Sequence, residues 1–292
     1  MLTETTSAYP VLIVGADGLI GRSLVDHFEA SGNLVWGTTK RHEITGDKCI
    51  YLDVSSDSAK WLIPPVQFRA AIICTAVTSL EKCRIDPIGS AQINVDGPLN
   101  LAKYLVDKGV FVVFISSNLV FDGSRPYAKS TDLVNPITEY GRQKALAEQA
   151  LLRLGNKVAV VRFSKILNPE FQLFQDWIHH LSIGKTIYPF SDMVFSPVPL
   201  NFAVQVLRNV VNLQISGITQ VSASQDITYY DVAKFLARKF NFNLNLLQPI
   251  EFNNGEYYKL PLHSTLDINR IKTELSLTVP SVWETIDGLV NR

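Results

Sequence analysis

Apolar runs and amphipathic segments alternate along the first half of the chain. Five runs of mainly aliphatic residues have the length of buried strands: Val11–Val14, Leu34–Gly37, Ala70–Thr75, Val110–Ile115 and Lys157–Arg162. Segments with helical periodicity lie between them, at Leu19–Ala30, about Ile88–Asp107 and Ile137–Leu154. Strands that are apolar on both faces and alternate with helices indicate a parallel sheet covered on both sides, which is a doubly wound α/β fold.

The alternation changes after about Ser164. We expect helices at about Phe171–Leu181, Asn201–Asn212, Tyr229–Phe240 and Val282–Val290, a short strand at Thr219–Ser222, and a loop at Ile187–Pro199. Thr228 is the expected N-cap of the third of these helices. Since no linker or repeat is visible, we expect a Rossmann-type domain over residues 1–163. A smaller substrate-binding lobe over residues 164–292 is expected to be interleaved with it rather than independent.

Three glycines with the spacing G-x-x-G-x-x-G directly follow the first apolar run, in VLIVGADGLIGRSL. Glycine permits a tight turn and lets the backbone approach a pyrophosphate, whose charge the N-terminus of the next helix stabilises. With a strand before it and a helix after it, this turn predicts a dinucleotide site. The contributing residues are expected to be Gly15, Asp17, Gly18, Leu19, Ile20 and Gly21.

The residues after the second expected strand indicate which dinucleotide binds. An Asp or Glu at this position accepts a hydrogen bond from the ribose 2′-hydroxyl of NAD. Here the stretch is Thr38-Thr39-Lys40-Arg41, and no carboxylate occurs before Glu43. We therefore expect NADP(H) as the preferred cofactor, bound by Thr39, Lys40 and Arg41, with NAD(H) as a second choice. Solvated loop charges are the alternative interpretation of the two cations.

Two further strand ends are expected to line the same site. Asp53 and Val54 follow the apolar stretch Ile50–Leu52, a position suited to capping an adenine with a carboxylate and a backbone amide. An ordinary aspartate at a strand end is the alternative. The small residues Thr75, Ala76 and Val77 end the next strand and would line the cofactor cleft at the carboxyl edge of the sheet.

Tyr140 and Lys144 lie four residues apart in a segment with helical periodicity, so they share one helix face. A phenol with its usual pKa of about 10 transfers protons poorly at neutral pH. A nearby ammonium group would lower that pKa and could also hold the nicotinamide ribose. Ser116 and Ser117, at the end of a strand, offer a hydroxyl to polarise a carbonyl. This set predicts carbonyl reduction by a nicotinamide hydride, with Tyr140 as the acid.

These motifs together resemble the extended short-chain dehydrogenase/reductase superfamily and, within it, the dTDP-4-dehydrorhamnose reductase family. The similarity runs over nearly the whole chain, in VLIVGADGLIGRSL, INVDGPLNLA, ISSNLVFDG, EYGRQKALAE, FSPVPLNFAVQVL and LPLHSTLDINRI. The resemblance implies that Ser117 polarises the carbonyl, Tyr140 is the acid, Lys144 binds the ribose, and Asn94 has a supporting active-site role. It also implies that Ser196 lies in a substrate-binding segment.

The chain departs from the family pattern at positions that concern the substrate. The Asp-Tyr pair implicated in sugar binding is Asn118-Leu119 here, the closing Arg is replaced by Leu260, and a Gly is missing from VRFSKILNPEF. The resemblance implies an NADPH-dependent reductase of a 4-keto nucleotide sugar, with Asn118 at the substrate. Two alternatives stay open: a nucleotide-sugar epimerase, and a non-catalytic regulatory subunit like the beta subunit of methionine adenosyltransferase.

Composition excludes several other classes. Hydrophobic residues make up 47% of the 292 residues and the net charge is zero, so a folded protein without a nucleic-acid partner is expected. The three cysteines lack metal-ligand spacing, so we expect no metal and a reducing compartment. No apolar run reaches the ~18 residues of a membrane span, and the N-terminus lacks signal-peptide features. We expect a cytoplasmic protein with a small-molecule substrate and no membrane partner; a homodimer would be the commonest assembly.

Overall fold

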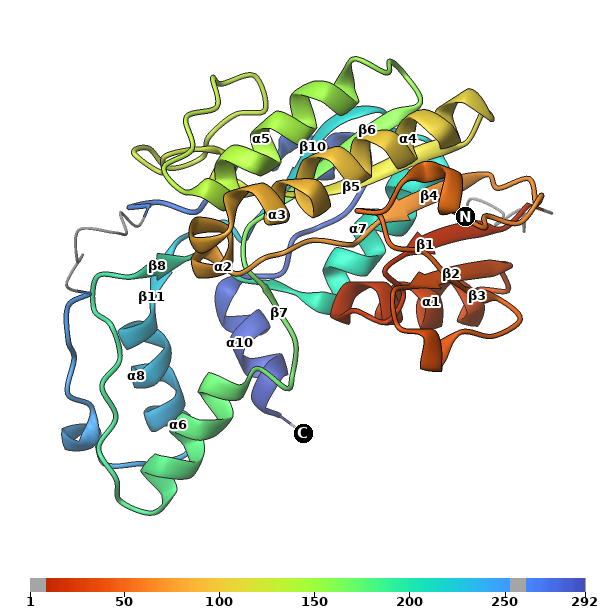
Figure 1. Cartoon of the computed structure of the whole chain (residues 1–292). Helices are drawn as coiled ribbons and strands as arrows, with labels where there is room; N and C mark the ends of the chain where they lie inside the picture. Colours follow the sequence, from red (N-terminus) through yellow and green to blue (C-terminus); the bar gives the residue numbers. More distant parts are fainter. Residues whose placement is uncertain (1–8, 253–260, 292) are drawn as a thin grey trace.

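The computed structural model describes residues 9–252 and 261–291, and a seven-stranded parallel sheet forms its centre (Figure 1). The strand order is β10-β6-β5-β4-β1-β2-β3. The bounds are β1 (Val11–Val14), β2 (Val35–Thr39), β3 (Cys49–Tyr51), β4 (Ala70–Ile73), β5 (Phe111–Ser117), β6 (Val158–Phe163) and β10 (Gly217–Val221). The order reverses between β1 and β4, the point at which doubly wound sheets bind nucleotides. The predicted fold class is confirmed.

Helices cover both faces of this sheet (Figure 1). Val11 and Ile13 of β1 pack with residues of α1 (Leu19–Ala30) and α7 (Leu200–Leu213). Leu12 and Val14 face the opposite side, toward α4 (Gly97–Asp107) and α5 (Glu139–Leu152). Because successive side chains of a strand point to opposite faces, a continuous apolar run supplies two cores at once.

The structure differs from the predicted elements at short or irregular segments. The single helix expected at Ile88–Asp107 is α3 (Pro87–Ala91), a turn of π-helix, η3 (Gln92–Asp96), and then α4. Two short helices were not predicted, α2 (Leu80–Ile85) and α9 (Asn269–Thr273), because five or six residues are too few to show a helical period. Short 3-10 turns are η1 (His42–Ile44), η2 (Ser58–Lys60), η4 (Asn118–Val120) and η5 (Leu244–Leu246).

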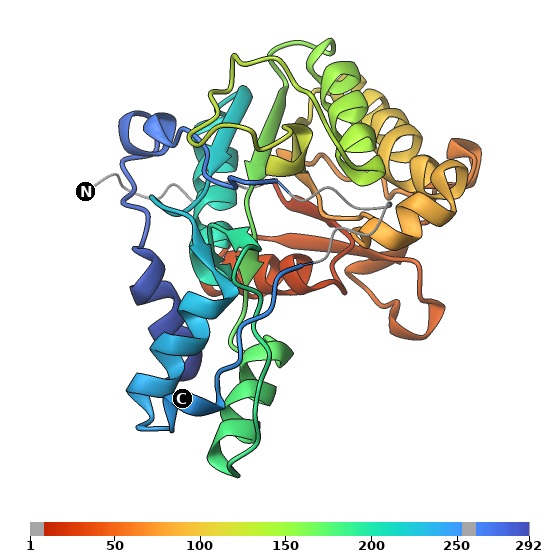
Figure 2. The ribbon, with the colours of Figure 1, turned by 90° about the vertical axis from the view of Figure 1, so that its left-hand side faces the viewer.

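The second half of the chain contributes to the sheet and also forms a lobe beside it. Both β10 and α7 belong to the sheet layers, whereas α6 (Gln172–Ser182), α8 (Tyr229–Lys239) and α10 (Val282–Val290) share a separate apolar core (Figures 1 and 2). Thr228 caps α8 in a capping box with Asp231, as predicted. The expected loop before α7 contains two-residue strands: β8 (Val194–Phe195) pairs with β11 (Ile227–Thr228), and β9 (Val198–Pro199) pairs with β7 (Ile166–Leu167).

Two properties of the described residues bear on the expected environment. Within residues 9–252 and 261–291, every helix is too short or too polar to cross a bilayer. The cysteines Cys49, Cys74 and Cys83 are free thiols. Leu260, one of the positions at which the sequence departs from the family pattern, lies outside the described residues.

Candidate active site

Two of the three glycines of the predicted nucleotide turn, Gly15 and Gly21, are required by close packing. Gly15 has a φ of +81°, and a Cβ atom built on it would lie 2.8 Å from Cγ2 of Thr75. A Cβ on Gly21 would lie 2.1 Å from the carbonyl oxygen of Gly15. Gly18 is the N-cap of α1, whose first turn contains Leu19 and Ile20. Side chains at Gly15 and Gly21 would fill the space that lets α1 begin directly against β1.

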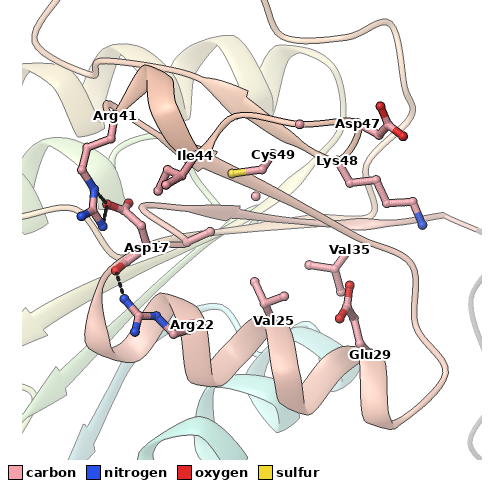
Figure 3. Close-up of a pocket in the computed structure, with 13 residues that line it drawn as sticks. Asp17, Arg22, Val25, Glu29, Val35, Arg41, Ile44, Asp47, Lys48 and Cys49 are labelled. Carbon is pink, nitrogen blue, oxygen red and sulfur yellow. Dashed lines mark hydrogen bonds and ion pairs between the residues drawn. The ribbon is translucent and has the colours of Figure 1, made fainter.

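The glycine turn is joined to the end of β2 by an ion pair (Figure 3). Asp17 accepts hydrogen bonds from Nε of Arg41 at 2.8 Å and from its Nη2 at 2.7 Å. Arg22 donates to the backbone carbonyl of Asp17 at 3.0 Å. Thr39 is buried, and its hydroxyl accepts a hydrogen bond from the backbone amide of Arg41. Lys40 is exposed. Asp17, Arg22 and Arg41 lie at one end of a pocket of about 650 Å³ between α1 and the β2–β3 segment.

The other predicted strand ends lie along the same edge of the sheet. Asp53 caps its own loop by accepting hydrogen bonds from the amide and hydroxyl of Ser55. The backbone of Val54 lies so close to the start of α4 that a Cβ on Gly97 would be 2.5 Å from its carbonyl oxygen. Thr75 and the half-buried Ala76 follow β4. The hydroxyls of Thr75 and Ser116 are buried and have no hydrogen-bond partner among the described residues.

The predicted catalytic side chains gather at the carboxyl end of β5. Lys144 donates to the carbonyl of Ile115 at 2.8 Å, and its ammonium lies 5.8 Å from the ring centre of Tyr140. Helix α5 can approach this strand end because residue 141 is glycine: a Cβ there would lie 2.0 Å from the carbonyl oxygen of Leu119. Ser117 ends β5, and its hydroxyl accepts the amide of Leu119 at 3.2 Å.

The expected lowering of the Tyr140 pKa is wrong for this structure. Burial raises the pKa of Tyr140 above its ordinary value, and the Cys83 thiol adds to this increase. Burial also lowers the pKa of Lys144 to about 8, while the Glu148 carboxylate opposes that shift. Each group loses hydration on burial, and this loss disfavours its charged form. Tyr140 therefore keeps its proton at neutral pH, which its predicted role as the acid requires.

A buried amide network that the sequence analysis missed supports the catalytic helix. Asn94 lies on the π-helical turn η3 and bonds to both backbone groups of Val77. Its side chain accepts a hydrogen bond from the amide of Val77 at 2.8 Å and donates one to the carbonyl of Val77 at 3.0 Å. Asn94 also donates to Gln143 of α5 at 2.7 Å. The amide nitrogen of Gln143 in turn contacts Ser90 and Glu139, each at 2.8 Å. The signal in the sequence was a polar residue, Gln143, three positions after Tyr140 on the same helix.

The two predicted substrate residues differ in accessibility. Asn118 is half-buried and accepts a hydrogen bond from the hydroxyl of Ser117 at 3.3 Å. Ser196 is fully buried, its hydroxyl donates to the carbonyl of Ala223 at 3.1 Å, and its carbonyl accepts the hydroxyl of Ser164. Asn118 therefore lies beside the hydroxyl of Ser117, whereas Ser196 is held within the protein.

The residues at the carboxyl edge of the sheet fit a dinucleotide. The glycine turn follows β1, and cationic side chains follow β2. The unpartnered hydroxyl of Thr75 lies just after β4, and that of Ser116 lies near the end of β5. Buried hydroxyls are normally hydrogen-bonded, so two such groups at one sheet edge indicate a polar ligand. Among the described residues, no group of three or more His, Cys, Asp or Glu could hold a metal ion.

Comparison with known proteins gives the family. The model of the RmlD substrate binding domain matches residues 9–292. The chain belongs to this family. The RmlD-family assignment confirms the resemblance to dTDP-4-dehydrorhamnose reductases of the extended short-chain dehydrogenase/reductase superfamily, and it supports the expectation of an NAD(P)-dependent oxidoreductase.

Relatives of two kinds share similar identity with this RmlD-family chain. The dTDP-4-dehydrorhamnose reductase of Aggregatibacter actinomycetemcomitans is 26% identical over 292 residues, covering 94% of this chain and 95% of the relative. Methionine adenosyltransferase 2 subunit beta of Bos taurus is 26% identical over 274 residues, covering 90% and 81%. The structure of dTDP-4-dehydrorhamnose reductase from Bacillus anthracis in complex with NADP has a TM-score of 0.83 at 23% identity, covers 96% of each chain, and shows the same fold.

Proposed function

We propose that this RmlD-family chain is an NADPH-preferring reductase of a 4-keto nucleotide sugar. The observation that carries the proposal is the arrangement of Ser117, Tyr140 and Lys144 around the carboxyl end of β5, where Lys144 bonds to the carbonyl of Ile115. A regulatory nucleotide-binding protein does not need this set of groups. The relative from Aggregatibacter actinomycetemcomitans, a dTDP-4-dehydrorhamnose reductase, supports the substrate class.

In this reaction Tyr140 gives its proton to the carbonyl oxygen of the substrate. A nicotinamide bound at this site would supply the hydride. Burial keeps Tyr140 protonated at neutral pH, so the acid is present in its active form. Ser117 donates a hydrogen bond to the same oxygen once its hydroxyl turns from Asn118. The two groups together stabilise the negative charge that develops on that oxygen.

Lys144 and Asn94 support that proton transfer without giving up a proton themselves. With a pKa of about 8, Lys144 is largely cationic at neutral pH and can hold the ribose hydroxyls of the cofactor. Its positive charge lies on the same helix face as Tyr140 and stabilises the phenolate left after proton transfer. Asn94 holds the backbone of Val77 in place beside the cleft. Substrate recognition would come from Asn118 and from the lobe within residues 164–292.

The cofactor is proposed to be NADP(H), with NAD(H) as a second choice. Arg41 and Arg22 lie beside the glycine turn, where a 2′-phosphate would need cations. The reductase from Bacillus anthracis was solved with NADP, and MoeE5, which has the same fold at a TM-score of 0.78, was solved with UDP-glucose and NAD. Members of this fold therefore use both cofactors.

A regulatory subunit is the second candidate, supported by the relatives named methionine adenosyltransferase 2 subunit beta. The replacement of the family's Asp-Tyr pair by Asn118-Leu119 also favours it, because these positions are implicated in reading the sugar. A subunit of this kind would bind NADPH and a protein partner, and its partner affinity would not depend on the Tyr140 hydroxyl.

The test is NADPH consumption by the wild-type protein and Tyr140→Phe with a panel of nucleotide-linked 4-keto sugars. The reductase proposal predicts turnover with at least one sugar. It also predicts a loss of about 10² to 10⁴-fold in the variant, the usual contribution of a general acid, with cofactor affinity retained. NADPH binding without turnover on any sugar would favour the regulatory candidate, and equal turnover by both proteins would remove Tyr140 from the mechanism.

A further inference from the structure

The ion pair between Asp17 and Arg41 joins the glycine turn to the end of β2 (Figure 3). In this fold the adenosine ribose of a dinucleotide is expected beside the end of β2. We propose that this pair selects the cofactor by offering two opposite partners to the same ribose position. Asp17 would accept the 2′-hydroxyl of NAD(H), and Arg41 would bind the 2′-phosphate of NADP(H). The inference rests on the proposed function, because it concerns the cofactor of that reaction.

The carboxylate that sequence analysis finds missing at the end of β2 comes from another element. Proteins of this fold that bind NAD usually carry an Asp or Glu about 20 residues after the glycines, where it bonds to the ribose. This chain has Thr39, Lys40 and Arg41 there instead. Asp17 lies within the glycine turn, and Arg41 holds its carboxylate at the end of β2 through two hydrogen bonds of 2.7 and 2.8 Å.

The cation of the pair is available to a phosphate. The Arg41 side chain is 49% exposed and that of Asp17 is 23% exposed, so the pair lies at the surface and can separate at low cost. Arg22 contacts the backbone carbonyl of Asp17 rather than its carboxylate. It stays beside the turn as a second cation when Arg41 turns to a phosphate. Arginine binds phosphate oxygens through paired hydrogen bonds, which strengthens this alternative.

The two cofactors place opposite demands on Asp17. A 2′-phosphate competes with the Asp17 carboxylate for Arg41 and is repelled by its negative charge. A 2′-hydroxyl gains an anionic acceptor and leaves the ion pair intact. Asp17 should therefore weaken NADPH binding and strengthen NADH binding, so that removing its charge moves the two affinities in opposite directions. A residue with a merely structural role would change both in the same direction.

The experiment measures the dissociation constants of NADPH and NADH for wild type, Asp17→Asn, Arg41→Met and the control Asp47→Asn. Asp47 lines the far end of the same pocket, so the control removes one negative charge at a distance from Arg41 (Figure 3). Asp17→Asn should tighten NADPH about fivefold and weaken NADH about fivefold, as expected for a partly exposed charge. Arg41→Met should weaken NADPH about tenfold or more and change NADH little. Asp47→Asn should leave the ratio unchanged.

The outcomes separate this inference from the proposed function. Equal changes for both cofactors in Asp17→Asn, or a shift of the same size in Asp47→Asn, would overturn the selector while leaving the reductase proposal intact. Wild-type protein that binds neither cofactor would overturn both. Repeating the measurement with adenosine 2′,5′-bisphosphate and adenosine 5′-phosphate should reproduce the opposite shifts, because these probes carry the 2′-group without the nicotinamide.

Discussion

The two ends of the candidate site are built in different ways. At the proposed adenosine end, Asp17 and Arg41 meet in a partly exposed ion pair. At the proposed catalytic end, Asn94, Gln143 and Lys144 are buried, and their polar groups bond to other buried groups and to backbone carbonyls. Exposed pairs contribute little to stability and rearrange easily, whereas buried polar groups are costly when a partner is lost. The adenosine end can therefore adapt to its ligand, while the catalytic end is set by folding.

The largest difference between the two ends should appear when a buried charge loses its partner. Arg162 of β6 is bound by Glu148 of the catalytic helix at 2.6 Å, and both side chains are 3% exposed. Glu148→Gln should lower the free energy of unfolding by about 3 to 5 kcal/mol, because it leaves the buried guanidinium uncompensated. Urea unfolding followed by circular dichroism measures this. A loss below about 1 kcal/mol, the size typical of a surface pair, would contradict the description of the catalytic end.

A pH dependence of stability should follow from the burial of Lys144. Its pKa is about 8 in the folded protein against an ordinary value of 10.5. Between these values only the unfolded chain binds the proton, so the free energy of unfolding should rise with pH. Relative to Lys144→Met, the wild type should gain up to about 3 kcal/mol across this window. Groups that do not interact with Lys144 titrate alike in both proteins and cancel in the difference between them. Parallel pH profiles would show that Lys144 keeps its ordinary pKa.

Loss of the amide network should have an intermediate effect. Gln143→Met removes the partner of Asn94, which should lower the free energy of unfolding by about 1 to 3 kcal/mol. It should also speed hydrogen exchange at the amide of Val77, because this amide donates its hydrogen bond to Asn94. Gln149→Met is the matched control, because Gln149 is exposed on the same helix. Similar losses in the two variants would mean that the network adds nothing beyond helix propensity.

The smallest effect on stability is expected at the adenosine end. Asp17→Asn should change the free energy of unfolding by less than about 1 kcal/mol, since the pair with Arg41 is partly exposed and screened by salt. Unfolding in low and high salt should give a difference between the two proteins that shrinks as salt is added. A destabilisation as large as that of Glu148→Gln would show that the two ends are not built differently.

The sequence predicted the features that depend on spacing within one element. The glycine turn and the Tyr140–Lys144 pair each occupy a short stretch whose secondary structure follows from apolar periodicity, so the fold class and the sheet edge could be inferred. The π-helical turn that carries Asn94 was not visible, because it interrupts a segment whose periodicity looks like one continuous helix.

Features that depend on tertiary contact could not be predicted. Asp17 and Arg41 are 24 positions apart, and Asn94 and Gln143 are 49 apart. The direction of the Tyr140 pKa was predicted wrongly because the spacing showed a neighbouring lysine but not the burial of both groups. Desolvation depends on what surrounds a residue in space, and it decided the sign of the shift.

In the proposed reaction a bound nicotinamide would transfer a hydride to a carbonyl while Tyr140 supplies the proton. The most direct measurement uses NADPH deuterated at the transferred position of the nicotinamide, with the 4-keto nucleotide sugar that supports the fastest consumption. Mass spectrometry should find the deuterium at the reduced carbon of the product with wild-type protein, and Tyr140→Phe should form this product about 10² to 10⁴-fold more slowly. Deuterium that stays on the cofactor, or transfer at equal rates by both proteins, would contradict it.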